Sequence, residues 1–191
     1  MIFSSLFFML FFLPLFLLFY FLSSSTEKKN NVILIFSLIF YCWGGLKYVI
    51  LLVLMTLVGW LFGINMQRRI SKEERKPFLI ASVVVFVGVL VFFKYTGFFL
   101  GMFGSLIKPD SPLLHMALPV GISFYTFKLI SYVVDVYRGN IEAEESFVGM
   151  LTYVSMFHHC VAGPIVRYST IGHELHERKH LYSDITYGIF R

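Results

Sequence analysis

The sequence predicts an all-α protein: a multi-pass transmembrane helical bundle of about six spans, some of them short or broken. The composition is the first indication of a membrane protein, because 58% of the 191 residues are hydrophobic and only 14% are charged. The mean hydropathy is +0.77. A soluble domain usually carries about 25% charged residues. The charges also leave six uncharged stretches, each at least seventeen residues long and so close to the ~20 that a helix needs to cross a bilayer. These stretches are residues 1–26, 30–46, 48–67, 77–93, 111–127 and 146–166.

The first third of the chain predicts one helix followed by a helical hairpin. The first helix covers Ile2–Leu22, and Pro14 inside it predicts a kink. We expect this helix to be retained rather than cleaved, because no Lys or Arg precedes it and it exceeds the about 7–15 apolar residues of a signal peptide. A polar loop, Ser23–Asn31, follows it. Val32–Trp43 and Tyr48–Met66 then form the hairpin, whose first arm is short for a full span.

The loop Gln67–Lys76 sets the expected orientation, since it carries an excess of Lys and Arg over Glu. Short loops of this kind stay in the cytoplasm. We therefore place loop 67–76 in the cytoplasm, the loop with Lys28 and Lys29 on the same side, and the N-terminus outside. The net charge of +5 is spread over the ends of apolar runs. That distribution indicates membrane orientation and not a surface for nucleic acid.

Three further helices complete the prediction. Pro77–Phe93 crosses outward, Pro119–Val136 crosses back, and Ser146–Ala162 forms a last helix that Gly163-Pro164 ends. The acidic side chains before this last helix suit its positive N-terminus; they are Glu142, Glu144 and Glu145. We divide the chain into a transmembrane region, 1–166, and an interfacial, His-rich amphipathic segment, 167–191, which we expect to continue beyond the chain end.

The helix after Pro119 contains ionisable groups that lipid should exclude. Lys128 and Asp135 lie seven residues apart, with Ser131 and Tyr132 between them and Tyr125 one turn earlier. Positions spaced three, four and seven apart share one helical face. Charges at membrane depth are costly and normally face a bundle interior or a water-filled cavity. The alternative is that Lys128 snorkels to the interface and Asp135 sits at the membrane edge.

Two adjacent histidines, His158 and His159, stand shortly before the helix-breaking pair at 163–164. Histidines in an apolar segment are often satisfied core residues. Beside a helix break they also suit irregular backbone that lines a cavity, because such backbone is not tolerated facing lipid. Arg167, just past the break, is placed to hold an anionic group. We expect these three residues to line a cavity.

Residues 176–180 match the H-E-x-x-H pattern of zinc proteases, in which two His ligands lie one helical turn apart. The two central residues, Arg178 and Lys179, are cationic and would repel a metal dication. We therefore expect no bound metal and interpret this segment as a solvated polar face.

Several stretches together resemble the membrane-bound O-acyltransferase (MBOAT) superfamily, and within it the bacterial alginate O-acetylases. They are Leu118–Phe127, Ile130–Gly139, Met1–Ser5, Phe93–Tyr95 and Phe157–Arg167. Two positions depart from the family pattern. The family usually has Pro where this chain has His158, and Gln or Glu near Lys128.

The resemblance implies a multi-pass protein of a bacterial plasma (inner) membrane that takes part in polysaccharide O-acetylation, as in alginate biosynthesis. Such an enzyme would take acetyl groups from a cytoplasmic acyl-thioester donor like acetyl-CoA. It would pass them to a cell-surface polysaccharide, with an extracytoplasmic acetyltransferase as partner and no bound cofactor. Family members are well over twice as long, and their catalytic histidine lies on a later helix that nothing here matches. This chain would then be the amino-terminal portion, inactive alone and lacking its C-terminal half.

The resulting candidates are cavity or motif residues and no catalytic residue: Tyr125, Lys128, Asp135, Arg138, His158, His159 and Arg167. We expect membrane lipid around the chain and no nucleic acid. The alternative function, from another class, is a small multi-span transporter or channel subunit. It would use the stripe from Lys128 to Asp135 as its pathway.

Overall fold

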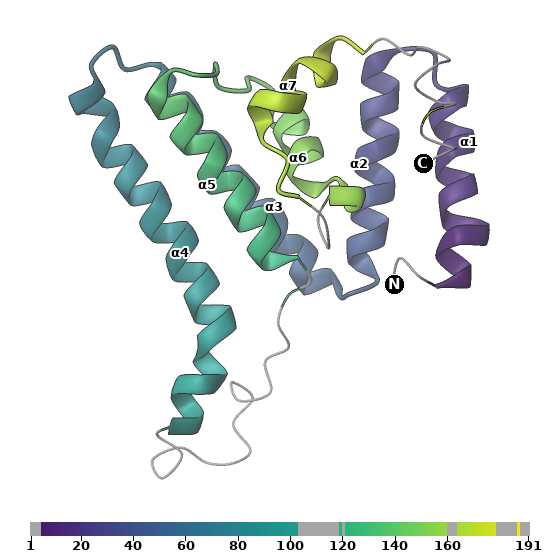
Figure 1. The fold of residues 1–191 in the computed structure, drawn as a ribbon, viewed down its shortest axis with the longest axis horizontal. Coiled ribbons are helices and arrows are strands. Elements are labelled where there is room, and N and C mark those ends of the chain that lie inside the picture. The colour runs from purple at the N-terminus through teal and green to yellow at the C-terminus, as the bar shows by residue number, and fades with distance from the viewer. Residues whose placement is uncertain (1–4, 103–118, 120, 160–163, 179–186, 188–191) are drawn as a thin grey trace.

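The computed structural model describes residues 5–102, 119, 121–159, 164–178 and 187, with the helical backbone alone for 97–102. All regular secondary structure in these ranges is helical. In chain order the elements are a π-helical turn η1 (Phe8–Phe12), α1 (Leu13–Leu22), α2 (Thr26–Cys42), α3 (Leu46–Gln67), α4 (Lys72–Met102), α5 (Ile122–Arg138), α6 (Phe147–Ser155), a 3-10 turn η2 (Phe157–His159) and α7 (Tyr168–His176). Figure 1 shows α1 and α4 at opposite edges of the bundle, with the short helices α6 and α7 between α2 and α5.

The charged connections gather at one end of the bundle. α1, α3 and α5 end there, α2, α4 and α6 begin there, and α7 lies across it (Figure 1). We call this the basic end and define it by residues 23–29, 67–76 and 138–146. The loops that carry Lys28, Lys29 and the 67–76 cations therefore lie at the same end. Which end faces the cytoplasm stays a prediction.

The first two helices differ from the prediction in two details. Pro14 has no N–H for the carbonyl one turn earlier, and the chain takes up a π-helical turn, η1, immediately before it. The predicted polar loop Ser23–Asn31 is wrong beyond Ser25, because α2 already begins at Thr26. The Ser25 hydroxyl caps this helix by accepting a hydrogen bond from the Lys28 N–H at 3.3 Å.

Two glycines of α3 set its distance from α5. A Cβ at Gly59 would lie 2.7 Å from Cδ2 of Leu129, and one at Gly63 would lie 2.6 Å from the Tyr132 hydroxyl oxygen. Any side chain at these two positions would therefore push the helices apart. Small residues that let two backbones approach are the usual device for packing helices in lipid. This close contact sets the rotation of α5 about its own axis, and so the direction in which its polar stripe points.

Two of the described helices are long and apolar enough to cross a membrane, judged by length and composition: Leu46–Gln67 and Lys72–Thr96. The apolar helix Phe8–Leu22 is shorter. Large apolar side chains are exposed on the outer helices, for example Leu10 (64%) on η1 and Val84 (65%) on α4. Lipid suits such a surface better than water does, so the chain is a membrane protein. The full set of about six spans stays a prediction.

The predicted helix over 146–162 is wrong in length. α6 ends at Ser155, and Met156 leaves the helical region with φ −41° and ψ 110°. The chain then forms the single turn η2. Gly163, which we expected to end the helix, lies outside the described residues, as do Leu118, Val120 and 160–162 of the motif stretches.

Phe157 accounts for the early break. Its ring enters a group of phenylalanines from η1, α1 and α2, and its N–H donates to the Ser37 hydroxyl of α2 at 3.2 Å. The ring centroids lie 5.2–6.1 Å from that of Phe157. The partners are Phe8, Phe12, Phe16 and Phe40. Burying this ring among aromatic residues outweighs continuing the helix by two turns.

Candidate functional site

The polar stripe of α5 faces the interior of the bundle. Tyr125, Lys128 and Asp135 are all buried, with Lys128 fully inaccessible and Asp135 4% exposed. One carboxylate oxygen of Asp135 accepts a hydrogen bond from the Asn140 side chain at 3.3 Å. Its other oxygen and the Tyr125 hydroxyl have no hydrogen-bond partner among the described residues. Arg138, the last residue of α5, is exposed at the basic end.

Lys128 makes its contacts with α6. Its Nζ donates to the backbone carbonyl of Tyr153 at 3.2 Å and lies 5.4 Å from the centroid of the Tyr153 ring. The last carbonyls of a helix lack intrahelical partners. If α6 continued, the Phe157 N–H would donate to the Tyr153 carbonyl. In this structure the Phe157 N–H donates to the Ser37 hydroxyl instead. A cation at a helix C-terminus is favourable. Lys128 therefore neither snorkels nor pairs with Asp135; it caps the C-terminal end of the broken helix.

His158 and His159 form the turn after that break and line a cavity of about 610 Å³. Their ring centroids are 4.2 Å apart. His159 Nδ1 is buried and has no hydrogen-bond partner in the described part of the chain, whereas His158 is exposed. The cavity lies between η1, α1, α2, η2 and α7. Arg167 is exposed just before α7 and is not among the described residues that line the cavity.

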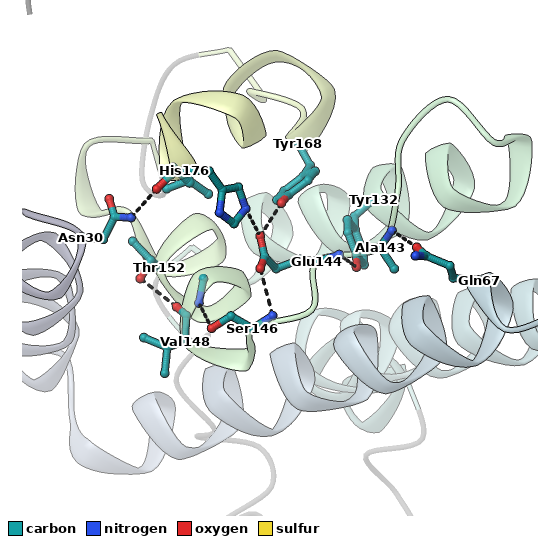
Figure 2. A network of polar contacts seen from close by, with 12 residues as sticks. Asn30, Gln67, Tyr132, Ala143, Glu144, Ser146, Val148, Thr152, Tyr168 and His176 are labelled. Carbon is teal, nitrogen blue, oxygen red and sulfur yellow. Dashed lines mark hydrogen bonds and ion pairs between the residues drawn. The ribbon is translucent and has the colours of Figure 1, made fainter. Parts of the chain in front are cut away.

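A second polar cluster lies at the basic end and centres on Glu144 (Figure 2). This residue is 3% exposed. One carboxylate oxygen accepts the Ser146 N–H at 2.9 Å. The other accepts the Tyr168 hydroxyl at 2.5 Å and lies 2.9 Å from Nε2 of His176. Because Tyr168 and His176 are the two ends of α7, this one carboxylate holds both ends of that helix.

The same loop is tied to the longer helices through its backbone. The Glu144 N–H donates to the Tyr132 hydroxyl of α5 at 3.0 Å, and the Ala143 N–H donates to the Gln67 side chain at the end of α3. Burial, and then the hydrogen bond to Glu144, raise the pKa of Tyr168 above its ordinary value. Tyr168 therefore stays protonated and acts as a donor. We call Glu144, Ser146, Tyr168 and His176 the Glu144 cluster.

The sequence did not predict this cluster. It indicated Glu144 only as an acidic residue before a helix, and His176 only as part of a metal-like pattern. α7 ends at His176, and Glu177 is extended with φ −129°; His180 lies outside the described residues. The partners of Glu144 are 24 and 32 residues away along the chain. A local pattern carries no signal for such contacts.

Comparison with known proteins bears on the family. No family model matches the chain, and no solved structure matches it. Over 160 residues, 81% of this chain, it is 34% identical to a probable alginate O-acetylase AlgI of Pseudomonas aeruginosa and 33% identical to that of Azotobacter vinelandii. A peptidoglycan O-acetyltransferase of Helicobacter pylori is 28% identical over 181 residues. The chain is a relative of these O-acetylases.

This confirms the resemblance drawn from the motifs. The chain spans only about a third of the length of these curated relatives, with 31% of the Pseudomonas protein and 34% of the Helicobacter protein covered. The O-acetylase relatives are named for acetyl transfer to alginate or to peptidoglycan, both of which are polysaccharides.

Proposed function

We propose that this chain is the amino-terminal portion of a membrane O-acetyltransferase. It would help to move acetyl groups from a cytoplasmic thioester donor toward a cell-surface polysaccharide. The observation that carries the proposal is the 33–34% identity to alginate O-acetylases over 81% of the chain. The weaker likeness to a peptidoglycan O-acetyltransferase extends the same chemistry to another acceptor. The acceptor class is therefore a polysaccharide, and an extracytoplasmic acetyltransferase is the expected partner.

The broken helix supports such a role. An acyl thioester does not cross a bilayer unaided, so donor and acceptor must meet through a passage in the protein. Non-helical backbone within a membrane is tolerated only where protein or a water-filled cavity surrounds it. The turn His158–His159 has that character, since it follows a helix end capped by Lys128 and lines a cavity. In this proposal α5, α6 and η2 form part of the passage wall.

No residue of this chain is proposed as the catalyst. A histidine with a pKa near neutrality suits the general base that deprotonates an acceptor hydroxyl. In the proposal this histidine belongs to the part of the protein that the 191 residues do not cover. The transport alternative gains no support, because Lys128 is engaged by a backbone carbonyl and forms no ion pair with Asp135.

The test compares two proteins in bacterial membranes that lack other membrane O-acetylases but contain the expected extracytoplasmic acetyltransferase partner. One is produced from the complete reading frame that contains this chain, and the other is the 191-residue chain alone. Both receive radiolabelled acetyl-CoA and either alginate or peptidoglycan, and alkali-labile acetyl on the polysaccharide is measured. We expect acetyl transfer from the complete protein and none from the chain alone. Absence of transfer to both acceptors by the complete, folded protein would refute the proposal. Transfer by the chain alone would refute the claim that the catalytic histidine lies outside these 191 residues.

A further inference from the structure

One wall of the 610 Å³ cavity is formed by α7, the helix that lies across the basic end (Figure 1). Three residues of this helix line the cavity: Ile171, Glu174 and Leu175. The remaining described walls come from η1, α1, α2 and the break after α6, which carries His158 and His159. The position of α7 therefore sets the shape of the cavity at the basic end.

Glu144 holds α7 in place without lining the cavity. Its carboxylate accepts the Tyr168 hydroxyl at 2.5 Å and lies 2.9 Å from Nε2 of His176. Tyr168 and His176 are the first and last residues of α7, so the three lining residues lie between the two contacts. A helix of nine residues that is fixed at both ends can shift little. One carboxylate outside the cavity thus fixes one of its walls.

Glu144 is itself held rigidly by the longer helices. It is 3% exposed, and its N–H donates to the Tyr132 hydroxyl of α5 at 3.0 Å. One of its carboxylate oxygens accepts the Ser146 N–H at 2.9 Å. A side chain that packing and hydrogen bonds lock in one rotamer can hold another group in a defined position. Glu144 therefore ties the position of α7 to that of α5.

The position of α7 also determines contacts across the cavity. Arg178, directly after this helix, donates to the Tyr20 hydroxyl of α1 at 2.8 Å, and both residues line the cavity. The Asn30 side chain of α2 donates to the Leu175 carbonyl at 2.6 Å. Because this carbonyl belongs to the backbone of α7, the contact depends directly on where the helix lies. α7 is thus joined to α1 and α2 at the basic end of the cavity.

We propose that Glu144 is a positioning residue for acetyl transfer: by holding α7, it gives the basic end of the cavity the shape that admits the acyl-thioester donor. This inference rests on the proposed function, in which the cavity belongs to the passage and the basic end faces the cytoplasm. Glu144 itself touches neither donor nor acceptor. Misplacing a group by about 1 Å, even far from the reacting atoms, can cost about 100-fold in rate. The polysaccharide arrives from the other side of the membrane and does not meet α7.

The experiment measures the kinetics of acetyl transfer by the protein produced from its complete reading frame. Detergent-solubilised membranes that contain the extracytoplasmic partner receive acetyl-CoA and polysaccharide, each varied separately. Glu144→Ala should raise the KM for acetyl-CoA by about tenfold or more and leave the KM for polysaccharide unchanged. Glu144→Gln keeps one acceptor oxygen and should recover part of the loss. Tyr168→Phe removes one of the contacts to α7 and should raise the same KM by less.

The split between the two KM values separates positioning from a loss of folded protein. Fewer folded molecules lower the maximal rate and leave both KM values unchanged, so this result in Glu144→Ala and Tyr168→Phe would overturn the inference. Equal rises in both KM values would also overturn it. Glu145→Ala, at an exposed neighbour, is the matched control and should behave like the wild type. If the wild type transfers acetyl and Glu144→Ala has the KM values of this control, the inference fails and the proposed function stands. If the wild type transfers none, both fail.

Discussion

Replacing Glu144 with alanine is expected to release α7 from the basic end of the bundle. The carboxylate accepts three hydrogen bonds, from the Ser146 N–H, the Tyr168 hydroxyl and His176. Alanine leaves the buried Tyr168 hydroxyl without an acceptor, which costs about 1–3 kcal/mol. The bond to the Ser146 N–H lies within the loop and does not join it to α7, so it does not count toward release of the helix. The His176 side chain is 62% exposed, so its contact adds little. The cost to the docking of α7 is therefore about 2 kcal/mol.

Trypsin cleavage at Arg178, followed by mass spectrometry of that one peptide bond, measures this cost, because the Arg178 side chain is held by Tyr20 and Asn30 while α7 is docked. When opening and closing are fast, cleavage follows the population of the open form. A loss of about 2 kcal/mol raises that population by about 30-fold. Glu145→Ala is the control, since Glu145 is an exposed neighbour, and it should leave the cleavage rate unchanged.

A double-mutant cycle separates the cluster from a general loss of stability. Glu144→Ala and Tyr168→Phe each remove one side of the same hydrogen bond, so their effects should couple by about 1 kcal/mol. The reasoning fails if Glu144→Ala is cleaved no faster than Glu145→Ala, or if the two effects simply add.

Two further substitutions test the packing of α5. Gly63→Ala places a methyl group 2.6 Å from the Tyr132 hydroxyl oxygen, which should cost about 1–3 kcal/mol of stability in a detergent thermal melt. Gly88→Ala, with nothing within 4 Å, should be neutral or slightly stabilising. Lys128→Ala leaves the Tyr153 carbonyl unpaired and a space in the core, and should cost about 2–4 kcal/mol in the same melt. The exposed neighbour Phe127→Ala is its control, and equal melting of the two variants would exclude the capping role.

The helices that follow from local pattern alone were predicted well. The second hairpin arm, predicted as Tyr48–Met66, and the helix predicted after Pro119 come close to their observed bounds, since uncharged runs act locally. The predicted helix bounds are wrong where contacts between residues far apart in the sequence determine where a helix begins or ends. α2 begins earlier than its apolar run because Ser25 caps it and Asn30, on its first turns, bonds the Leu175 carbonyl of α7 at 2.6 Å. α6 ends earlier because Phe157 packs on helices more than a hundred residues away along the chain.

The candidate site divides in the same way. Spacing alone predicted that Lys128 and Asp135 share a face, and both are buried. The partner of Lys128 could not be predicted from the sequence. It is the Tyr153 backbone carbonyl, which lacks an intrahelical partner only because α6 ends early. The Glu144 cluster was missed entirely, since its members come from a loop and from both ends of another helix. The roles of Tyr125, Arg138, His158, His159 and Arg167 stay predictions.

The contact between Arg178 and Tyr20 joins residues 158 positions apart. A ribosome adds about 5–20 residues each second, so roughly 8–30 s pass between the synthesis of the two partners. During that interval α1 and α2 are already made while the residues that cover their inner face are still missing. The nascent protein must therefore keep an unfinished aromatic surface from associating wrongly. Biogenesis of this protein accordingly depends on what covers α1 and α2 until the segment that contains Arg178 has been synthesised.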